Sequence, residues 1–253
     1  MKYEGYLIDL DGTVYRGEEK IEPAGEFVNK LYAQNIPYLF VTNNSAKTRE
    51  QVAEKLQGLD IPADPENVMT SSMATASVMA EEMPGASVYV IGEEGVYRAL
   101  EDNGLRVVEE DADAVVVGID RGLTYDKLAL ACLQLQKGAA FYSTNPDVAF
   151  PTELGLVPGN GSLTALLATA TGRKPTYVGK PEAAIVEQAL EMLGTDKDKT
   201  LMVGDNYDTD ILAGIRAGLD TLLVHTGITT KEKLGSYNVQ PTYTRDSLAE
   251  WKI

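Results

Sequence analysis

Tyr6-Leu7-Ile8-Asp9-Leu10-Asp11-Gly12-Thr13 is the stretch that decides the fold prediction for this chain. Its apolar first half is typical of a buried β-strand, and Gly12 allows a sharp turn where that strand stops. Residues two positions apart on a strand share a face, so Asp9 and Asp11 are expected to leave the strand together. Paired carboxylates suit a divalent cation such as Mg²⁺ and a carboxylate nucleophile. The alternative is an ordinary acidic turn, because Asp and Gly are common turn residues.

Three further apolar runs, 38–41, 176–178 and 200–203, also end in polar residues. The first is followed by Thr42-Asn43, the second by Gly179-Lys180 and the third by Gly204-Asp205. In open α/β sheets, sites form beyond the carboxyl ends of the strands, so these residues are expected to lie close together. Acids, a hydroxyl, an amide and a lysine are the groups needed to bind a phosphoryl group and a metal.

Taken in order, these segments resemble the four motifs of the haloacid dehalogenase superfamily of phosphatases. The first motif is matched by Asp9-x-Asp11-Gly12-Thr13, the second by Thr42-Asn43, the third by Lys180 and the fourth by Gly204-Asp205-x4-Asp210. The long gap between the second and third motifs matches the branch with a large inserted cap of the C2 type. Within that branch, four segments resemble the NagD-like phosphatases: 41–45, 143–147, 159–163 and 178–181. The resemblance covers nearly the whole chain.

The resemblance implies roles for the acids and for the metal. Asp9 would attack phosphorus and form an aspartyl-phosphate, and Asp11 would protonate the leaving alkoxide and then activate water. Mg²⁺ would be held by the carboxylates of Asp9 and Asp205 and by the backbone carbonyl of Asp11. Asp210 would orient these ligands or Lys180, and Asn206 is a candidate contact to metal-bound water or to the ligand.

The phosphate-binding residues follow from the same resemblance. The Thr42 hydroxyl and the Asn43 backbone N–H would bind phosphate oxygens, and Lys180 would act as a mobile cation that balances the developing charge. The alternative for Thr42-Asn43 is common turn chemistry, and Lys180 could be a solvated lysine. Asp208 is a candidate N-cap for a helix that ends before Gly218.

Substrate choice is expected to come from the inserted cap. Its loop 143–158 offers Asn145, Asp147 and Phe150 as candidate substrate-binding residues. The loop leads into a helix N-terminus at Gly161-Ser162, a polar end that can face an anion. The alternatives are an ordinary turn at Asn145-Pro146-Asp147 and packing of Phe150 inside the cap.

Strand-like and helix-like segments alternate along the chain, which predicts a doubly wound parallel α/β sheet with an inserted α/β cap domain. We expect residues 1–80 and 178–253 to form a discontinuous, Rossmann-like core and residues 81–177 to form the cap. The strand before Lys180 is expected to return to the first sheet. Residues 243–253 are expected to add a short strand and a short helix.

The composition agrees with an enzyme that acts on small molecules. The 253 residues carry a net charge of -16, with 38 acids against 22 bases, and no Lys/Arg cluster predicts nucleic-acid binding. No basic-then-apolar leader and no apolar run of about 18 residues is present, so we expect a cytoplasmic protein with no membrane partner. The single cysteine, Cys132, excludes an intrachain disulfide. The expected partner is a small phosphorylated metabolite, and the sequence allows a homo-oligomer.

The leading functional hypothesis is a Mg²⁺-dependent phosphomonoesterase that hydrolyses nucleoside monophosphates or sugar phosphates through an aspartyl-phosphate. One alternative is a receiver-like phosphoacceptor signalling domain, but such domains are shorter and carry no cap. Thr13 and the late Gly204-Asp205 motif also argue against it. Another alternative is a phosphotransferase or mutase that uses the same intermediate. Such an enzyme must hold a second phosphate, and the cap loop has no extra basic residues for that purpose.

Overall fold

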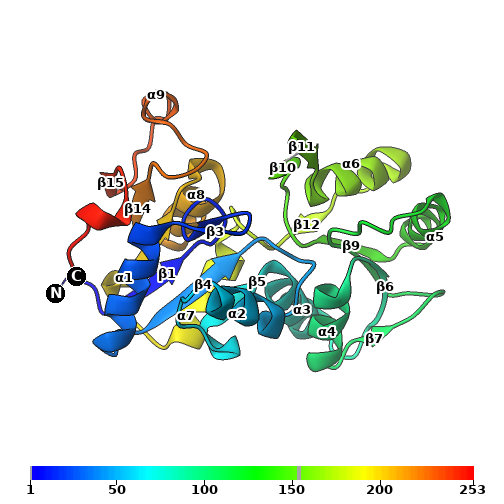
Figure 1. Ribbon diagram of the computed structural model, residues 1–253. Coiled ribbons are helices and arrows are strands. Elements are labelled where there is room, and N and C mark those ends of the chain that lie inside the picture. Colours follow the sequence, from blue (N-terminus) through cyan, green and yellow to red (C-terminus); the bar gives the residue numbers. More distant parts are fainter. Residues whose placement is uncertain (1, 153–154) are drawn as a thin grey trace. The chain divides into compact units, whose positions relative to one another are not determined.

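The computed structural model describes residues 2–152 and 155–253 (Figure 1). The chain forms two compact units, which are described separately. The first contains Met1–Thr42, Arg49–Met69 and Lys180–Ile253, and the second contains Asn43–Thr48 and Thr70–Gly179. The predicted domain limits, 1–80 with 178–253 and 81–177, stay a prediction. They differ from the two units in placing residues 43–48, 70–80 and 178–179 with the core.

The first unit is built on a sheet whose strands follow the order β15-β14-β13-β1-β4-β5. Neighbouring strands from β15 to β4 pair in parallel. A β-hairpin, β2–β3, follows the first strand. The elements associated with this sheet are β1 (Gly5–Ile8), β2 (Tyr15–Arg16), β3 (Glu19–Lys20), α1 (Glu22–Ala33), β4 (Tyr38–Thr42), α2 (Arg49–Gly58), the 3₁₀ turn η1 (Pro65–Asn67), β5 (Val68–Thr70), α7 (Ala183–Leu193), the 3₁₀ turn η2 (Lys197–Lys199), β13 (Thr200–Gly204), the π-helical turn η3 (Tyr207–Ile211), α8 (Leu212–Ala217), β14 (Asp220–Val224), α9 (Lys231–Leu234), β15 (Tyr243–Arg245) and the 3₁₀ turn η4 (Leu248–Glu250).

Strand order in this sheet reverses between β1 and β13. After β1 the chain adds β4 and β5 on one side, and it later adds β13, β14 and β15 on the other. The carboxyl ends of β1 and β13 therefore flank a topological switch point, the usual position of a ligand site in such a sheet.

Both faces of this sheet are buried, which explains why its strands are nearly continuous apolar runs. On one face, Tyr6 and Ile8 of β1 pack with Phe27 and other apolar residues of α1 and α2. Leu7 points the opposite way and is also fully buried. Helix α7 contacts β1 and β4. Pro23 lies in the first turn of α1, where its missing backbone N–H costs no helical hydrogen bond.

The second unit has its own parallel sheet, with the strand order β12-β9-β8-β6-β7. Apolar residues of α3 and α4 pack on one face, and residues of α5 and α6 pack on the other. Its elements are α3 (Ser71–Glu82), β6 (Ser87–Ile91), α4 (Glu94–Asp102), β7 (Arg106–Val107), β8 (Ala114–Val117), α5 (Tyr125–Gln136), β9 (Ala140–Ser143), β10 (Ala149–Thr152), β11 (Gly155–Pro158), α6 (Asn160–Thr171) and β12 (Thr176–Tyr177).

The predicted fold class, a doubly wound α/β core with an α/β insert, is confirmed, but three local expectations were wrong. The strand before Lys180 does not join the first sheet, because β12 pairs with β9 of the second sheet. The loop 143–158 contains the antiparallel hairpin β10–β11. The helix expected from Asp208 begins with the π-helical turn η3, and the N-cap is Asn206, whose side chain accepts from Asp208 N.

In the described part of the chain, no helix combines the length and the apolar character that a membrane crossing requires.

The packing of α1 gives a stability prediction. Phe27 is 2% exposed and packs edge-to-face on Tyr6, with 5.3 Å between the ring centroids. Tyr32 on the same helix is 62% exposed. Phe27→Ala should lower the free energy of unfolding by about 3–5 kcal/mol, because it removes a buried ring and leaves a cavity. Tyr32→Ala is the control and should change it by less than about 0.5 kcal/mol. Urea unfolding followed by circular dichroism measures both; equal effects of the two substitutions would contradict the packing described.

Candidate active site

Asp9 directly follows the last residue of β1. Its backbone N–H donates to Val203 O at 2.9 Å, so the hydrogen-bonding ladder with β13 continues to this residue. Asp9 is 7% exposed. The strand therefore places a nearly buried carboxylate at the switch point of the first sheet.

Asp205 directly follows β13 and is fully buried. Its Oδ1 accepts from the Thr13 hydroxyl at 3.0 Å, and its Oδ2 accepts from the Ile228 backbone N–H at 2.7 Å. Two glycines leave room for this carboxylate. A Cβ on Gly12 would lie 2.6 Å from Asp205 Oδ2, and a Cβ on Gly227 would lie 1.9 Å from it. Gly12 also has a φ of +90°, a conformation that L side chains rarely adopt.

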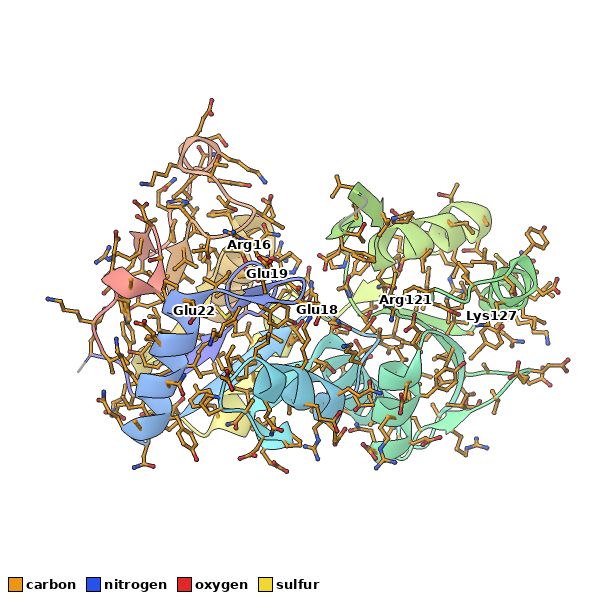
Figure 2. All side chains as sticks on the ribbon, in the orientation of Figure 1. Arg16, Glu18, Glu19, Glu22, Arg121 and Lys127 are labelled. Carbon is orange, nitrogen blue, oxygen red and sulfur yellow. The ribbon has the colours of Figure 1, made fainter. Side chains whose placement is uncertain are left out.

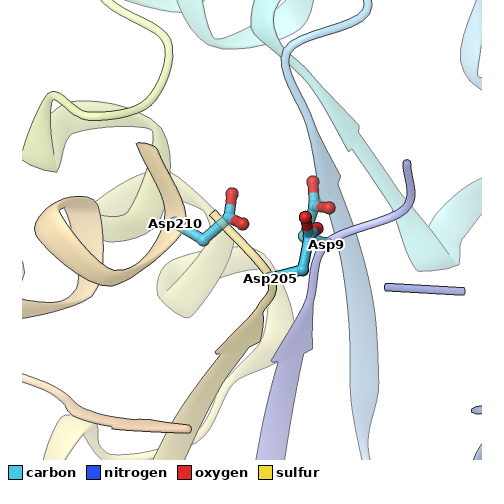
Figure 3. Close-up of side chains that lie close together, drawn as sticks. All are labelled: Asp9, Asp205 and Asp210. Carbon is cyan, nitrogen blue, oxygen red and sulfur yellow. The ribbon is translucent and has the colours of Figure 1, made fainter. Parts of the chain in front are cut away.

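Asp210 comes from the π-helical turn η3 and is 1% exposed. Its Oδ2 accepts from the Asn206 backbone N–H at 3.0 Å. Ligand oxygens of Asp9, Asp205 and Asp210 all lie within 4.8 Å of one another. Figure 3 shows the three carboxylates gathered where β1 and β13 end. Asp9 of the first motif thus meets Asp205 and Asp210 of the fourth, whereas Asp11 is not part of this cluster.

Lys180 lies among these acids and is 1% exposed. Its Nζ donates to Asp9 Oδ1, lies 2.9 Å from Asp210 Oδ1 and donates to Val41 O at 2.8 Å. The sequence-based picture of a mobile cation differs from this geometry, because the ammonium is held by at least three oxygens.

The electrostatics of the cluster follow from its burial. Burial and then the charge of Asp210 raise the pKa of the Asp9 carboxyl well above its usual range. The same two causes raise the pKa of Asp205 to about 6. Burial alone would lower the pKa of Lys180, but the charges of Asp210 and Asp9 outweigh it and raise that pKa. When all groups are ionised, three carboxylates face one ammonium, so two negative charges are uncompensated.

This donor set fits a hard divalent cation. Carboxylate oxygens are the ligands that Mg²⁺ prefers, and two positive charges would balance the excess negative charge. Lys180 forms ion pairs with Asp9 and Asp210, and its charge also acts on Asp205, where it lowers the pKa against the effect of burial.

Asp11 differs from the other acids because it is exposed. It forms a β-bridge with Tyr15. Burial, followed by the charges of Asp11 and Asp9, raises the pKa of the Tyr15 hydroxyl. Tyr15 is 4% exposed, so a buried residue lies opposite the exposed Asp11 in this bridge.

Thr42 and Asn43 stand where β4 ends. Thr42 is buried and is the last residue of the strand, beside β1 in the sheet. Asn43 is the first residue of the second unit, and its side-chain Nδ2 donates to Asp147 Oδ2 at 3.0 Å.

The other candidates from the inserted loop also lie in the second unit. Asn145 is buried, whereas Asp147 and Phe150 are partly exposed. Phe150 belongs to β10, opposite Val157 of β11. The start of α6 differs from the expected anion site, because the Gly161 N–H donates to Asp147 O at 2.8 Å.

Asn206 and His225 have structural contacts. The Asn206 side chain caps η3 by accepting from Asp208 N at 3.1 Å. Asp208 faces outward and pairs with Lys233 at 2.8 Å. Nδ1 of His225 lies 2.9 Å from Thr229 O.

Sequence reasoning missed the loop after β14 as part of this site. The loop supplies the Ile228 N–H to Asp205, and its Thr226 hydroxyl donates to Gly12 O at 2.7 Å. Arg16 Nε of the β2–β3 hairpin donates to Thr226 O at 2.9 Å, and Figure 2 labels Arg16 with its hairpin neighbours Glu18 and Glu19. A backbone donor leaves no side-chain signature in the sequence.

Comparison with known proteins identifies the class. Residues 6–106 match the family described as haloacid dehalogenase-like hydrolase, and residues 177–251 match a HAD-hydrolase-like family. The chain is 60% identical to the 5'-nucleotidase YutF of Bacillus subtilis over 249 residues, which cover 98% of this chain and 97% of that protein. It is 50% identical to an acid sugar phosphatase of Staphylococcus aureus over 250 residues, 98% of this chain and 96% of that one.

A solved phosphatase structure has the same fold as this chain. A mutant of the thermostable p-nitrophenylphosphatase from Bacillus stearothermophilus superimposes with a TM-score of 0.90 at 61% identity, covering 99% of this chain and 98% of that one. The chain belongs to the haloacid dehalogenase-like hydrolases, in their NagD-like group. It is a phosphatase, which favours the enzyme hypothesis over the receiver-like alternative.

The contact between Gly227 and Asp205 gives a prediction for the site. Gly227→Ala should lower phosphatase kcat/KM by roughly a hundredfold, because the new methyl group must displace the Asp205 carboxylate. Gly235→Ala is the matched control, since its Cβ would lie 3.4 Å from the nearest atom, Glu232 O. Steady-state kinetics and a thermal unfolding curve are measured for both variants. Normal activity of a folded Gly227→Ala protein would show that the Asp205 carboxylate can move without loss.

Proposed function

We propose that the chain is a Mg²⁺-dependent phosphomonoester hydrolase that acts through an aspartyl-phosphate on Asp9. The buried contact between Lys180, Asp9 and Asp210 carries the proposal. Burying charged groups is costly, and a fold that only needed stability could use apolar residues there. An ionised nucleophile, held beside a cation at a sheet switch point, is instead what attack on a phosphate ester requires.

The first half-reaction transfers the phosphoryl group to Asp9. Lys180 engages Oδ1, which leaves Oδ2 to attack phosphorus. The P–O bond to the alcohol breaks, and Asp11 gives its proton to the leaving oxygen. Because Asp11 is exposed, its carboxyl can reach a leaving group outside the buried cluster.

The second half-reaction regenerates the enzyme. Asp11, now a carboxylate, takes a proton from water, and the hydroxide attacks phosphorus. The bond between phosphorus and Asp9 Oδ2 breaks, which releases inorganic phosphate. The Thr42 hydroxyl and the Asn43 N–H bind the phosphoryl oxygens.

The metal would be held by Asp9 and Asp205, with the Asp11 backbone carbonyl as a further ligand and Asp210 and Asn206 beside them. Mg²⁺ would supply charge neutralisation and orientation of the phosphate oxygens. Hydrogen bonds from the Thr13 hydroxyl and the Ile228 backbone N–H fix the orientation of the Asp205 carboxylate, which would be presented to the metal in that orientation.

Small phosphorylated metabolites are the proposed substrates. The similar proteins named as a 5'-nucleotidase and an acid sugar phosphatase support nucleoside monophosphates or sugar phosphates. Phosphate release from a panel of these esters identifies the preferred class. Transfer of the phosphoryl group to a second metabolite in place of water would favour a phosphotransferase.

Asp9→Asn should abolish turnover while leaving the fold intact, because an amide cannot attack phosphorus. Removing a covalent nucleophile costs several orders of magnitude in kcat. Asp208→Asn is the matched control, since Asp208 is an exposed acid that pairs with Lys233 on the outer side of η3. Phosphate release and unfolding curves are recorded for both. Residual activity of Asp9→Asn above about a tenth of wild type would remove Asp9 as the nucleophile.

Chelation gives a separate test of the metal. Excess EDTA should stop phosphate release, and added Mg²⁺ should restore it, because the uncompensated acids would repel an anionic substrate. Thermal unfolding with and without Mg²⁺ provides a readout besides activity, since a bound ion stabilises the folded state. Full activity in EDTA would rule out the metal-dependent mechanism.

A further inference from the structure

Two of the points where the chain passes between its units adjoin residues of the proposed site. The first lies between Thr42 and Asn43, and the second lies between Gly179 and Lys180. The peptide that joins Thr42 to Asn43 carries the N–H proposed to bind phosphate. How the second unit holds the chain directly next to these two peptides therefore bears on the phosphate-binding end of the site.

Asn145 of the second unit holds the first peptide segment. Its Nδ2 donates to Asn43 O at 2.8 Å, and its Oδ1 accepts from the Asp147 N–H at 3.1 Å. Asn145 is 3% exposed. Both ends of its amide are thus used inside the unit, in a position that is poor for contact with a leaving group.

The neighbouring residue, Thr144, holds the second segment. Its carbonyl oxygen accepts from the Gly179 N–H at 2.9 Å, directly before Lys180. A Cβ on Gly179 would lie 2.3 Å from that oxygen, so the two backbones are in close contact. Two consecutive residues of one loop thus bind the chain beside Thr42 and beside Lys180.

The side chain of Asn160, which is also 3% exposed, fixes this loop by hydrogen bonds. Asn160 Nδ2 donates to Asn145 O at 2.8 Å and lies 3.2 Å from Thr144 Oγ1. The segment after Asn43 is held as well, because Ser45 Oγ accepts from the Ile119 N–H at 2.9 Å. A rigid support on both sides gives the Asn145 amide a defined position.

We propose that Asn145 is a positioning residue for the phosphate-binding N–H of Asn43, acting on the phosphoryl group and not on the leaving group. The proposal rests on the proposed function, in which Asn43 binds phosphate. It differs from the sequence-based expectation that Asn145 contacts the variable part of the substrate. Because every phosphate ester shares the phosphoryl group, loss of the Asn145 amide affects all of them alike.

The test measures Asn145→Ala on p-nitrophenyl phosphate, a nucleoside monophosphate and a sugar phosphate. We expect kcat/KM to fall roughly ten- to a hundredfold on all three, with ratios between substrates unchanged within about threefold. The inhibition constant of inorganic phosphate, which has no leaving group, should rise as well. Val148→Ala is the matched control in the same loop, 71% exposed, and should behave as wild type.

A second variant separates positioning from folding. Asn145→Asp keeps the size of the side chain and the acceptor for Asp147 N but replaces the donor to Asn43 O. It should show the same parallel loss, with a thermal unfolding midpoint close to that of wild type. If either folded variant loses activity only on the metabolites, or loses none, the proposal is wrong. A wild-type protein without Mg²⁺-dependent phosphatase activity would instead overturn the proposed function itself.

Discussion

The buried ammonium of Lys180 is the interaction on which the rest of the site depends. Asp9 and Asp210 would repel each other at buried positions, and the Lys180 ammonium, which pairs with both, offsets part of that cost. The offset is incomplete, as the raised pKa values of Asp9 and Asp205 indicate. The fold therefore maintains a concentrated negative charge that a divalent cation would neutralise, and that neutralisation would let an anionic phosphate ester bind.

The sheet explains why these groups meet. Strand order reverses between β1 and β13, so Asp9 and Asp205 leave adjacent strands at the same end. The space around Asp205 is then shaped by Gly12 and Gly227, whose missing side chains admit the carboxylate. In the second unit, Asn145 binds the chain beside Thr42. The proposed mechanism thus depends on a charge cluster that the first unit fixes.

Much of this could be predicted from the sequence, because apolar runs that end in Asp9, Thr42 and Asp205 report strands and strand ends together. The contacts to Asp205 could not be predicted from the sequence, because the Ile228 N–H belongs to the backbone of a loop distant in the chain. The β12 strand was assigned to the wrong sheet because two residues show no periodicity, and pairing with β9 decides their place. The hairpin β10–β11 was missed because a proline normally argues against a strand.

The most direct test of the central claim is to trap the covalent intermediate. Wild-type protein is mixed with p-nitrophenyl phosphate and Mg²⁺, quenched in acid within one turnover and digested, and the peptides are analysed by mass spectrometry. The account predicts a phosphoryl group on the peptide that contains Asp9, assigned to its carboxylate by fragmentation, and none when Mg²⁺ is chelated. Turnover with no phosphorylated peptide at any time point, or a phosphoryl group on a different residue, would contradict it.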